Sequence, residues 1–99
     1  MTTVQLHPAI PDLVQQLSEE PSVQRVLLFG SRARGTARDR SDIDLAIDAP
    51  CASEQEWDRI AVAVDEAETL LRIDLIRLDE ASGDFREEIE REGVVLFAR

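Results

Sequence analysis

The chain has 99 residues and a net charge of −10, because 21 acidic residues outnumber 11 basic ones. This length allows a single small domain over residues 1–99, and so strong a negative charge disfavours direct binding to nucleic acid. All the basic residues are arginines, which excludes chemistry that needs a lysine, such as a Schiff base or a P-loop.

The sequence also lacks the marks of a membrane or secreted protein. No apolar run reaches the roughly 18 residues that a membrane span needs. The N-terminus has no basic-then-apolar pattern of a secretion signal, and a single cysteine allows no disulfide within the chain. We therefore expect a cytoplasmic protein that does not contact a membrane.

Apolar residues recur with the spacings of helices and strands, which predicts seven elements. In chain order these are a helix at 9–19, strands at 23–29 and 41–48, a long helix from Ser53 to about Leu71, a strand at 73–77, a helix between Ser82 and Gly93, and a strand at 94–97. Ser53 and Glu56 have the spacing of a capping box, and residues 31–40 form a polar connection. The order α-β-β-α-β-α-β predicts an α/β (α+β) fold with helices packed on a mixed sheet of about four strands.

The strand at 41–48 alternates apolar and polar side chains, so Asp42 and Asp44 project from the same side of it. Their bases lie roughly 6–7 Å apart in an extended strand. Two carboxylates this close repel each other unless a cation, a proton or an arginine lies between them. Two interpretations are open on this pair alone: the strand has an ordinary solvated acidic face, or the pair belongs to a functional site.

The connection at 31–40 is basic in an otherwise acidic chain. It holds four arginines and one aspartate, a net charge of +3, whereas the rest of the chain carries −13. Gly30 and Ser31 follow directly after a buried strand, where backbone N–H groups and a small hydroxyl can approach a phosphate closely. Beside the two carboxylates, these features predict a site for a small polyphosphate with a divalent metal ion.

The arginines of this connection allow two interpretations. Their guanidinium groups bind phosphate oxygens, or they lie in a solvated loop that offsets the charge of acidic neighbours. The solvated loop is the simpler interpretation for Arg38 and Arg40. Arg32 and Arg34 lie nearer to the Gly-Ser pair and are the candidates for binding phosphate.

A third carboxylate, Asp74, lies in the middle of the apolar strand at 73–77, where it would be costly to bury without a partner. Either the polar side of this strand is open to solvent, or Asp74 meets Asp42 and Asp44 on a neighbouring strand. The second arrangement gives three carboxylates on one sheet face. That is enough to bind two metal ions and to deprotonate an attacking hydroxyl.

Residues 29–47, FGSRARGTARDRSDIDLAI, combine Gly-Ser, ten intervening residues and Asp-x-Asp. This combination resembles the signature of the DNA polymerase β-type nucleotidyltransferase superfamily, and most of all its small "minimal nucleotidyltransferase" (MNT) branch. Asp74 fits the third carboxylate of that family, and the closing EIEREGVVLF is similar to the ends of these short proteins. The resemblance implies the polymerase β-like nucleotidyltransferase fold and Mg²⁺-dependent transfer of a nucleotide.

The resemblance implies that three carboxylates are catalytic and bind metal. Asp42 and Asp44 would bind two Mg²⁺ ions between them. Asp74 would bind the ion next to the attacking hydroxyl and help to deprotonate that hydroxyl. None of these positions departs from the family pattern.

The resemblance also implies where the nucleotide lies. Gly30 and Ser31 would hold the β- and γ-phosphates of a nucleoside triphosphate, with ATP as the expected substrate. Arg32 and Arg34, the basic side chains nearest to this pair, become candidate nucleotide-binding residues.

Proteins of the MNT type are encoded beside a small helical HEPN-domain protein, and the two form a toxin–antitoxin pair. The resemblance implies that this chain is such an antitoxin and transfers AMP from ATP to a tyrosine of a HEPN ribonuclease toxin. A net charge of −10 suits a basic, RNA-binding partner. Two alternatives stay open: neutralisation of the partner by binding without turnover, and transfer to a small molecule, which the lack of a second domain makes less favourable.

Overall fold

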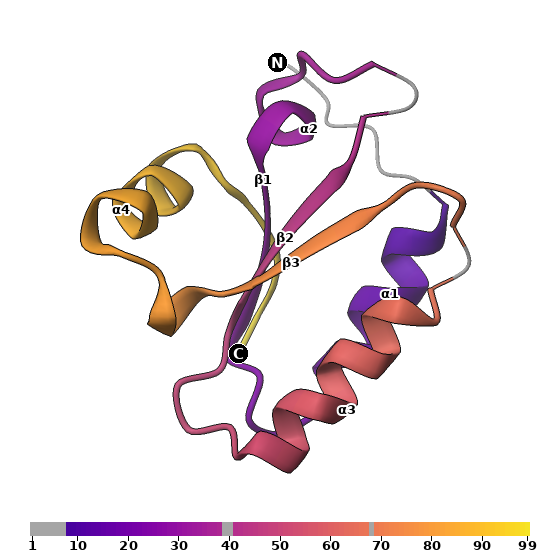
Figure 1. Cartoon of the computed structure of the whole chain (residues 1–99), viewed down its shortest axis with the longest axis vertical. Coiled ribbons are helices and arrows are strands. Elements are labelled where there is room, and N and C mark those ends of the chain that lie inside the picture. The colour runs from indigo at the N-terminus through magenta and orange to yellow at the C-terminus, as the bar shows by residue number, and fades with distance from the viewer. Residues whose placement is uncertain (1–7, 39–40, 68) are drawn as a thin grey trace.

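The computed structural model describes residues 8–38, 41–67 and 69–99. Its elements, in chain order, are α1 (Ala9–Ser18), β1 (Arg25–Phe29), α2 (Gly30–Arg34), β2 (Ile43–Asp48), α3 (Glu54–Asp65), β3 (Ile73–Arg77), the 3₁₀ turn η1 (Leu78–Glu80), α4 (Gly83–Glu92) and β4 (Val94–Ala98) (Figure 1). All seven predicted elements are present in the predicted order. In these described ranges, no helix is both long and apolar enough to cross a membrane.

The four strands form one mixed sheet in the order β3-β2-β1-β4. Strand β1 pairs antiparallel with both β2 and β4, whereas β2 pairs parallel with β3. A parallel pair needs a crossover connection, which α3 supplies between β2 and β3. The predicted mixed sheet of four strands is therefore confirmed.

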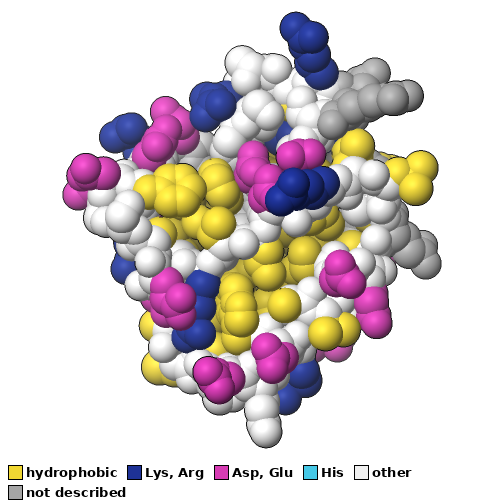
Figure 2. Space-filling model, in the orientation of Figure 1, with side chains coloured by type: hydrophobic (Ala, Val, Ile, Leu, Met, Phe, Trp, Pro, Cys, Tyr) yellow, Lys and Arg dark blue, Asp and Glu magenta, His cyan; other side chains and the backbone are white. Residues whose placement is uncertain are grey.

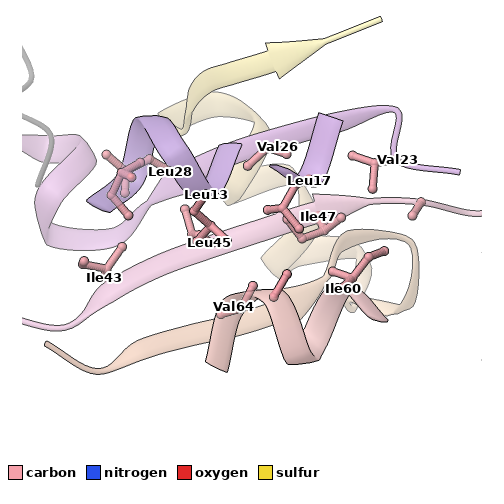
Figure 3. Close-up of a cluster of buried hydrophobic side chains, with 13 residues drawn as sticks. Leu13, Leu17, Val23, Val26, Leu28, Ile43, Leu45, Ile47, Ile60 and Val64 are labelled. Atoms are coloured by element: carbon pink, nitrogen blue, oxygen red, sulfur yellow. The ribbon is translucent and has the colours of Figure 1, made fainter. Parts of the chain in front are cut away.

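Helices α1 and α3 cover one face of the sheet (Figures 1 and 3). Strand β2 contributes Ile43, Leu45 and Ile47 to this face, and all three are fully buried, because alternate residues of a strand point to the same side. They form one apolar cluster with residues that include Leu13 of α1 and Ile60 of α3. The alternation in the sequence predicted this face correctly.

Helix α4 packs on the opposite face of the sheet (Figure 1). This face is only partly apolar. Its buried cluster consists of four residues, namely Leu27, Ala46, Leu78 and Ile89. Charged side chains share the face: Arg25 Nε lies 3.0 Å from Asp48 Oδ2, and the same guanidinium pairs with Glu90 of α4. This face therefore combines a small core with ion pairs. The ion pairs lie at the Arg25 and Asp48 end of the strands, and the candidate site lies at the opposite end, near Gly30 and Asp44.

Helix α3 is shorter than the sequence predicted. The capping box is present, because Glu56 N donates to Ser53 Oγ at 3.1 Å and Ser53 N donates to Glu56 Oε1 at 3.0 Å. The helix ends at Asp65, however, so Ala67 and Leu71 pack against the core from the connection to β3. Apolar spacing marked them as inward-facing but could not distinguish a helix from the chain that follows it.

The polar connection after β1 begins with a short helix, α2, which the sequence pattern did not predict. Gly35 ends this helix with φ +77°, a left-handed conformation that glycine adopts at little cost. The N–H of Gly35 donates to the carbonyl of Ser31. A helix of five residues spans too few turns for apolar periodicity to reveal it.

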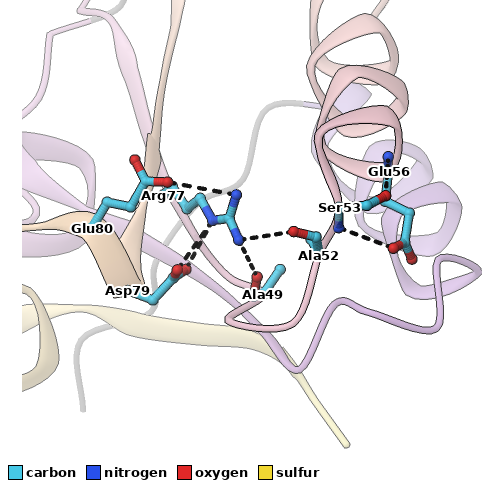
Figure 4. Close-up of polar contacts among 7 residues, drawn as sticks. All are labelled: Ala49, Ala52, Ser53, Glu56, Arg77, Asp79 and Glu80. Carbon is cyan, nitrogen blue, oxygen red and sulfur yellow. Dashed lines mark hydrogen bonds and ion pairs between the residues drawn. The ribbon is translucent and has the colours of Figure 1, made fainter.

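Arg77, at the end of β3, holds the connection that leaves β2 (Figure 4). Its Nη2 donates to the carbonyl oxygens of Ala49 at 3.0 Å and Ala52 at 3.1 Å, and its Nε lies 3.1 Å from Asp79 Oδ2. The guanidinium also lies 5.3 Å from the centre of the Trp57 ring. This arginine fixes the start of α3 at the end of the sheet opposite the candidate site.

Candidate functional site

The chain turns from β1 into α2 at Gly30, and this turn packs directly on Asp44. Gly30 has φ +73°, and a Cβ added to it would lie 3.1 Å from the Asp44 Cγ and would clash with Oδ2. Phe29, the last residue of β1, pairs in register with Asp44. Glycine is therefore required here for two reasons, the positive φ and the close approach of a carboxylate.

The parallel pairing of β2 and β3 places Asp44 beside Asp74 on neighbouring strands. Both belong to the face opposite Ile43 and Leu45, because side chains alternate along a strand. Asp42 lies two residues before Asp44, on the same side, and is exposed. The structure combines the two arrangements open for Asp74: it lies beside Asp44, and 39% of its side chain is exposed to solvent.

The negative charges of these carboxylates act on Asp44. The pKa of Asp44 is raised, first by burial and then by the negative charges of Asp74 and Asp42. The positive charge of Arg34 opposes this rise. Asp44 therefore lies at the centre of an acidic cluster whose charge is only partly offset, which favours the binding of a cation.

Arg72, which no pattern in the sequence singled out, contacts this cluster. Its Nε lies 2.9 Å from Asp74 Oδ1. Figure 2 shows acidic side chains gathered on the visible face with a basic side chain lying against them. The available signal was the spacing: Arg72 directly precedes β3, two residues before Asp74, and an extended backbone places such residues on one face.

Arg32 holds the end of the basic connection in place. Its Nε and Nη2 donate to the carbonyl of Ser41 at 3.2 and 2.7 Å. Ser41 directly precedes Asp42, so Arg32 helps to set the direction in which the chain enters the acidic cluster. The hydrogen bonds to Ser41 are observed, whereas the binding of nucleotide by Arg32 stays a prediction.

The other arginines of the connection lie in different settings. Arg34 Nη1 lies 3.5 Å from Glu92 Oε2 at the end of α4, and its charge acts on Asp44. Arg38 is exposed and its backbone N–H donates to the hydroxyl of Ser41 at 2.8 Å. Arg40 lies outside the described residues. Among the described arginines of this connection, Arg34 is therefore the one whose charge acts on Asp44, and its binding of phosphate stays a prediction.

The carboxylates fit Mg²⁺ in their chemistry without forming a complete protein cage. Over residues 8–38, 41–67 and 69–99, no three His, Cys, Asp or Glu side chains are grouped so as to hold a metal ion. Mg²⁺ prefers oxygen ligands and is usually held by one or two carboxylates together with substrate phosphates and water. Asp42 and Asp44 supply the carboxylates that such a substrate-completed site needs.

Residues 12–99 match the family described as "Polymerase beta, Nucleotidyltransferase". The chain belongs to this family. It is therefore a nucleotidyltransferase, and both the resemblance drawn from the Gly-Ser and Asp-x-Asp pattern and the fold that it implied are confirmed.

Individual relatives point to one branch of the family. "Probable protein adenylyltransferase MntA" of Haemophilus influenzae is 36% identical over 92 residues, which cover 88% of this chain and 75% of the relative. A crystal structure of a toxin–antitoxin with AMP-PNP is 26% identical with a TM-score of 0.64, covering 89% of this chain and 73% of that one. A protein provisionally described as a minimal nucleotidyltransferase shares the fold, with a TM-score of 0.66 at 24% identity and 85% of each chain covered.

Proposed function

We propose that this nucleotidyltransferase is a Mg²⁺-dependent protein adenylyltransferase that acts as an antitoxin. It transfers AMP from ATP to a tyrosine hydroxyl of a partner HEPN ribonuclease toxin. The observation that carries the proposal is the position of Asp44, which packs against the Gly30 turn and lies in register with Asp74. A turn suited to phosphate and the acidic cluster thus meet at one end of the sheet.

Each part of the site has a task in this reaction. The backbone at Gly30 and Ser31 binds the terminal phosphates, and Arg34 offsets their charge. Two Mg²⁺ ions, held by Asp42 and Asp44 with the phosphates, would stabilise the negative charge that develops during transfer.

Asp74 acts on the acceptor. Its carboxylate takes the proton of the acceptor hydroxyl as that oxygen attacks the α-phosphorus. The bond from the α-phosphorus to the bridging oxygen breaks, and pyrophosphate leaves. The products are the AMP ester of the acceptor and pyrophosphate, and the proton passes from Asp74 to solvent.

Two relatives support a protein acceptor and an adenine nucleotide. The Haemophilus influenzae relative is described as a protein adenylyltransferase, and the toxin–antitoxin structure at 26% identity was obtained with AMP-PNP. The net charge of −10 is complementary to a basic partner such as an RNA-binding toxin.

The proposal is tested by incubating the protein with ATP, Mg²⁺ and the product of the adjacent gene, and then measuring the intact mass of that product. We expect the mass to rise by one AMP, with label transferred from α-labelled but not from γ-labelled ATP. Asp44→Asn should abolish the mass change. Label transferred from the γ-phosphate, or no change of mass with an active toxin as partner, would contradict the proposal.

A second candidate function is neutralisation by binding alone. The similar toxin–antitoxin structures favour it, because their descriptions name a toxin together with an antitoxin. The two candidates differ in one result: a stable complex of unmodified partner, with the toxin inhibited equally by wild type and Asp44→Asn, would support binding. Transfer to a small molecule would leave the partner unmodified and unbound.

A further inference from the structure

The contact between Arg72 and the acidic cluster is open to solvent. Arg72 Nε lies 2.9 Å from Asp74 Oδ1, and 75% of the Arg72 side chain and 39% of the Asp74 side chain are exposed. An exposed ion pair of this kind contributes little stability. The Arg72 guanidinium therefore pairs with an expected metal ligand, Asp74, and can move away from it at a small cost in free energy.

The backbone holds Arg72 at this position independently of its ion pair. The N–H of Ile43 donates to the Arg72 carbonyl at 2.9 Å, and Ile43 pairs in register with Ile73. Continued one residue earlier, the same parallel register brings the backbone of Arg72 level with that of Asp42. The backbone thus keeps Arg72 within reach of the carboxylates, and in this structure its side-chain conformation pairs the guanidinium with Asp74.

We propose that Arg72 is the counter-ion of the carboxylate cluster. Its guanidinium pairs with Asp74 in the nucleotide-free protein and is displaced when a divalent cation binds to Asp74. The inference rests on the proposed function, because it takes Asp74 to be a metal ligand. Arg72 is a positioning residue in this scheme. It acts through Asp74 and takes no part in the bond changes.

Such a counter-ion should weaken the binding of a free cation. A guanidinium hydrogen-bonded to Asp74 Oδ1 and a metal ion cannot both bind that oxygen, and the positive charge of Arg72 opposes a second cation nearby. Divalent cations should therefore bind weakly to the free protein and gain their full ligand set only together with the nucleotide, whose phosphates complete the site.

The test measures Mn²⁺ binding without nucleotide, by the loss of the free-ion EPR signal. Arg72→Gln should bind Mn²⁺ about two- to fivefold more tightly than wild type, the range given by losing competition from one exposed ion pair. The matched control is Arg59→Gln, which removes the same charge from another exposed ion pair, with Arg59 Nε 2.6 Å from Glu20 Oε1. This control should change Mn²⁺ affinity little.

A double-mutant cycle separates direct competition from a general effect of charge. In an Asp74→Asn background, Arg72→Gln should no longer tighten Mn²⁺ binding. The inference is overturned if Arg72→Gln behaves like Arg59→Gln, if its effect persists without Asp74, or if none of these proteins binds Mn²⁺. None of the measurements uses ATP or a partner, so a failure of AMP transfer with the cycle intact would count against the proposed function and leave the role of Arg72 standing.

Discussion

The two faces of the sheet use adjacent residues of one strand for opposite purposes. On the face toward α1 and α3, β2 contributes Leu45, which is fully buried among aliphatic side chains. On the other face it contributes Asp44, which is held against Gly30 and other carboxylates. The first face stabilises the fold by excluding water, whereas the second keeps an acidic cluster at its edge whose charge is only partly offset.

This difference separates stability from chemistry within one short strand. Substitutions on the apolar face should lower the free energy of unfolding and affect activity only through the fold. Substitutions at the acidic cluster should abolish activity and leave the protein folded.

Asp44→Asn should lower the rate of nucleotide transfer by about a thousandfold or more, because it removes a charged ligand at the centre of the site. The folded protein should persist, since the substitution also removes repulsion by Asp74 and Asp42. The measurement is the transfer rate together with circular dichroism of the same preparation. A variant that transfers nucleotide at the wild-type rate would show that Asp44 is not a metal ligand.

Leu45→Ala should have the opposite profile. Removing a buried leucine side chain costs about 2–5 kcal/mol of unfolding free energy, a large part of the stability of a domain this small. Urea unfolding measures the loss. Under conditions where the variant is folded, its nucleotide affinity should equal that of wild type. A loss of nucleotide affinity in the folded variant would show that the apolar face also contributes to binding.

Arg34→Ala should weaken ATP binding about tenfold, the effect of losing one charge-assisted contact. Arg38→Ala is the matched control, because Arg38 belongs to the same connection and is exposed. We expect it to weaken binding less than twofold. Equal effects at both positions, decreasing with added salt, would indicate long-range attraction rather than a contact.

The smallest expected effect is on the pH dependence of stability. The pKa of Asp44 is raised in the folded protein, so the folded state binds this proton more tightly than the unfolded chain does. The ionised carboxylate therefore destabilises the fold at neutral pH, and this destabilisation is relieved as the pH falls through the raised pKa.

Asp44→Asn cannot ionise and should melt at a higher temperature than wild type at pH 7.5. The difference in Tm should shrink as the pH falls through the acidic range. Asp12→Asn, at an exposed position of α1, controls for the loss of one negative charge. A Tm difference for Asp44→Asn that is constant with pH would contradict the assigned cause of the raised pKa.

The sequence was sufficient for the features that depend on local pattern. Alternation in β2 assigned Ile43 and Leu45 to the core, and the Ser53 cap marked the start of α3. The sequence left two possibilities open for Asp74: exposure to solvent, or a position beside the other carboxylates. Its position depends on the register of β2 and β3, which is set by how α3 returns the chain to the sheet.

Other features depend on contacts between distant residues and left no local signal. Helix α2 is too short to show periodicity. The bond from Arg32 to the Ser41 carbonyl and the pairing of Arg34 with Glu92 distinguish arginines that look alike in the sequence. Charge alone predicted a basic loop, and the structure shows that its described arginines make different contacts.

The central claim is that the charged end of the sheet is a catalytic site in which Asp74 acts on the acceptor hydroxyl. The most direct test is to measure the transfer rate of Asp74→Asn beside its ATP·Mg²⁺ affinity and melting temperature. We predict a rate reduced by about a hundredfold or more, with affinity within a few-fold of wild type and the fold intact. A lowered melting temperature with an unchanged transfer rate would instead show that Asp74 is structural and would contradict the account.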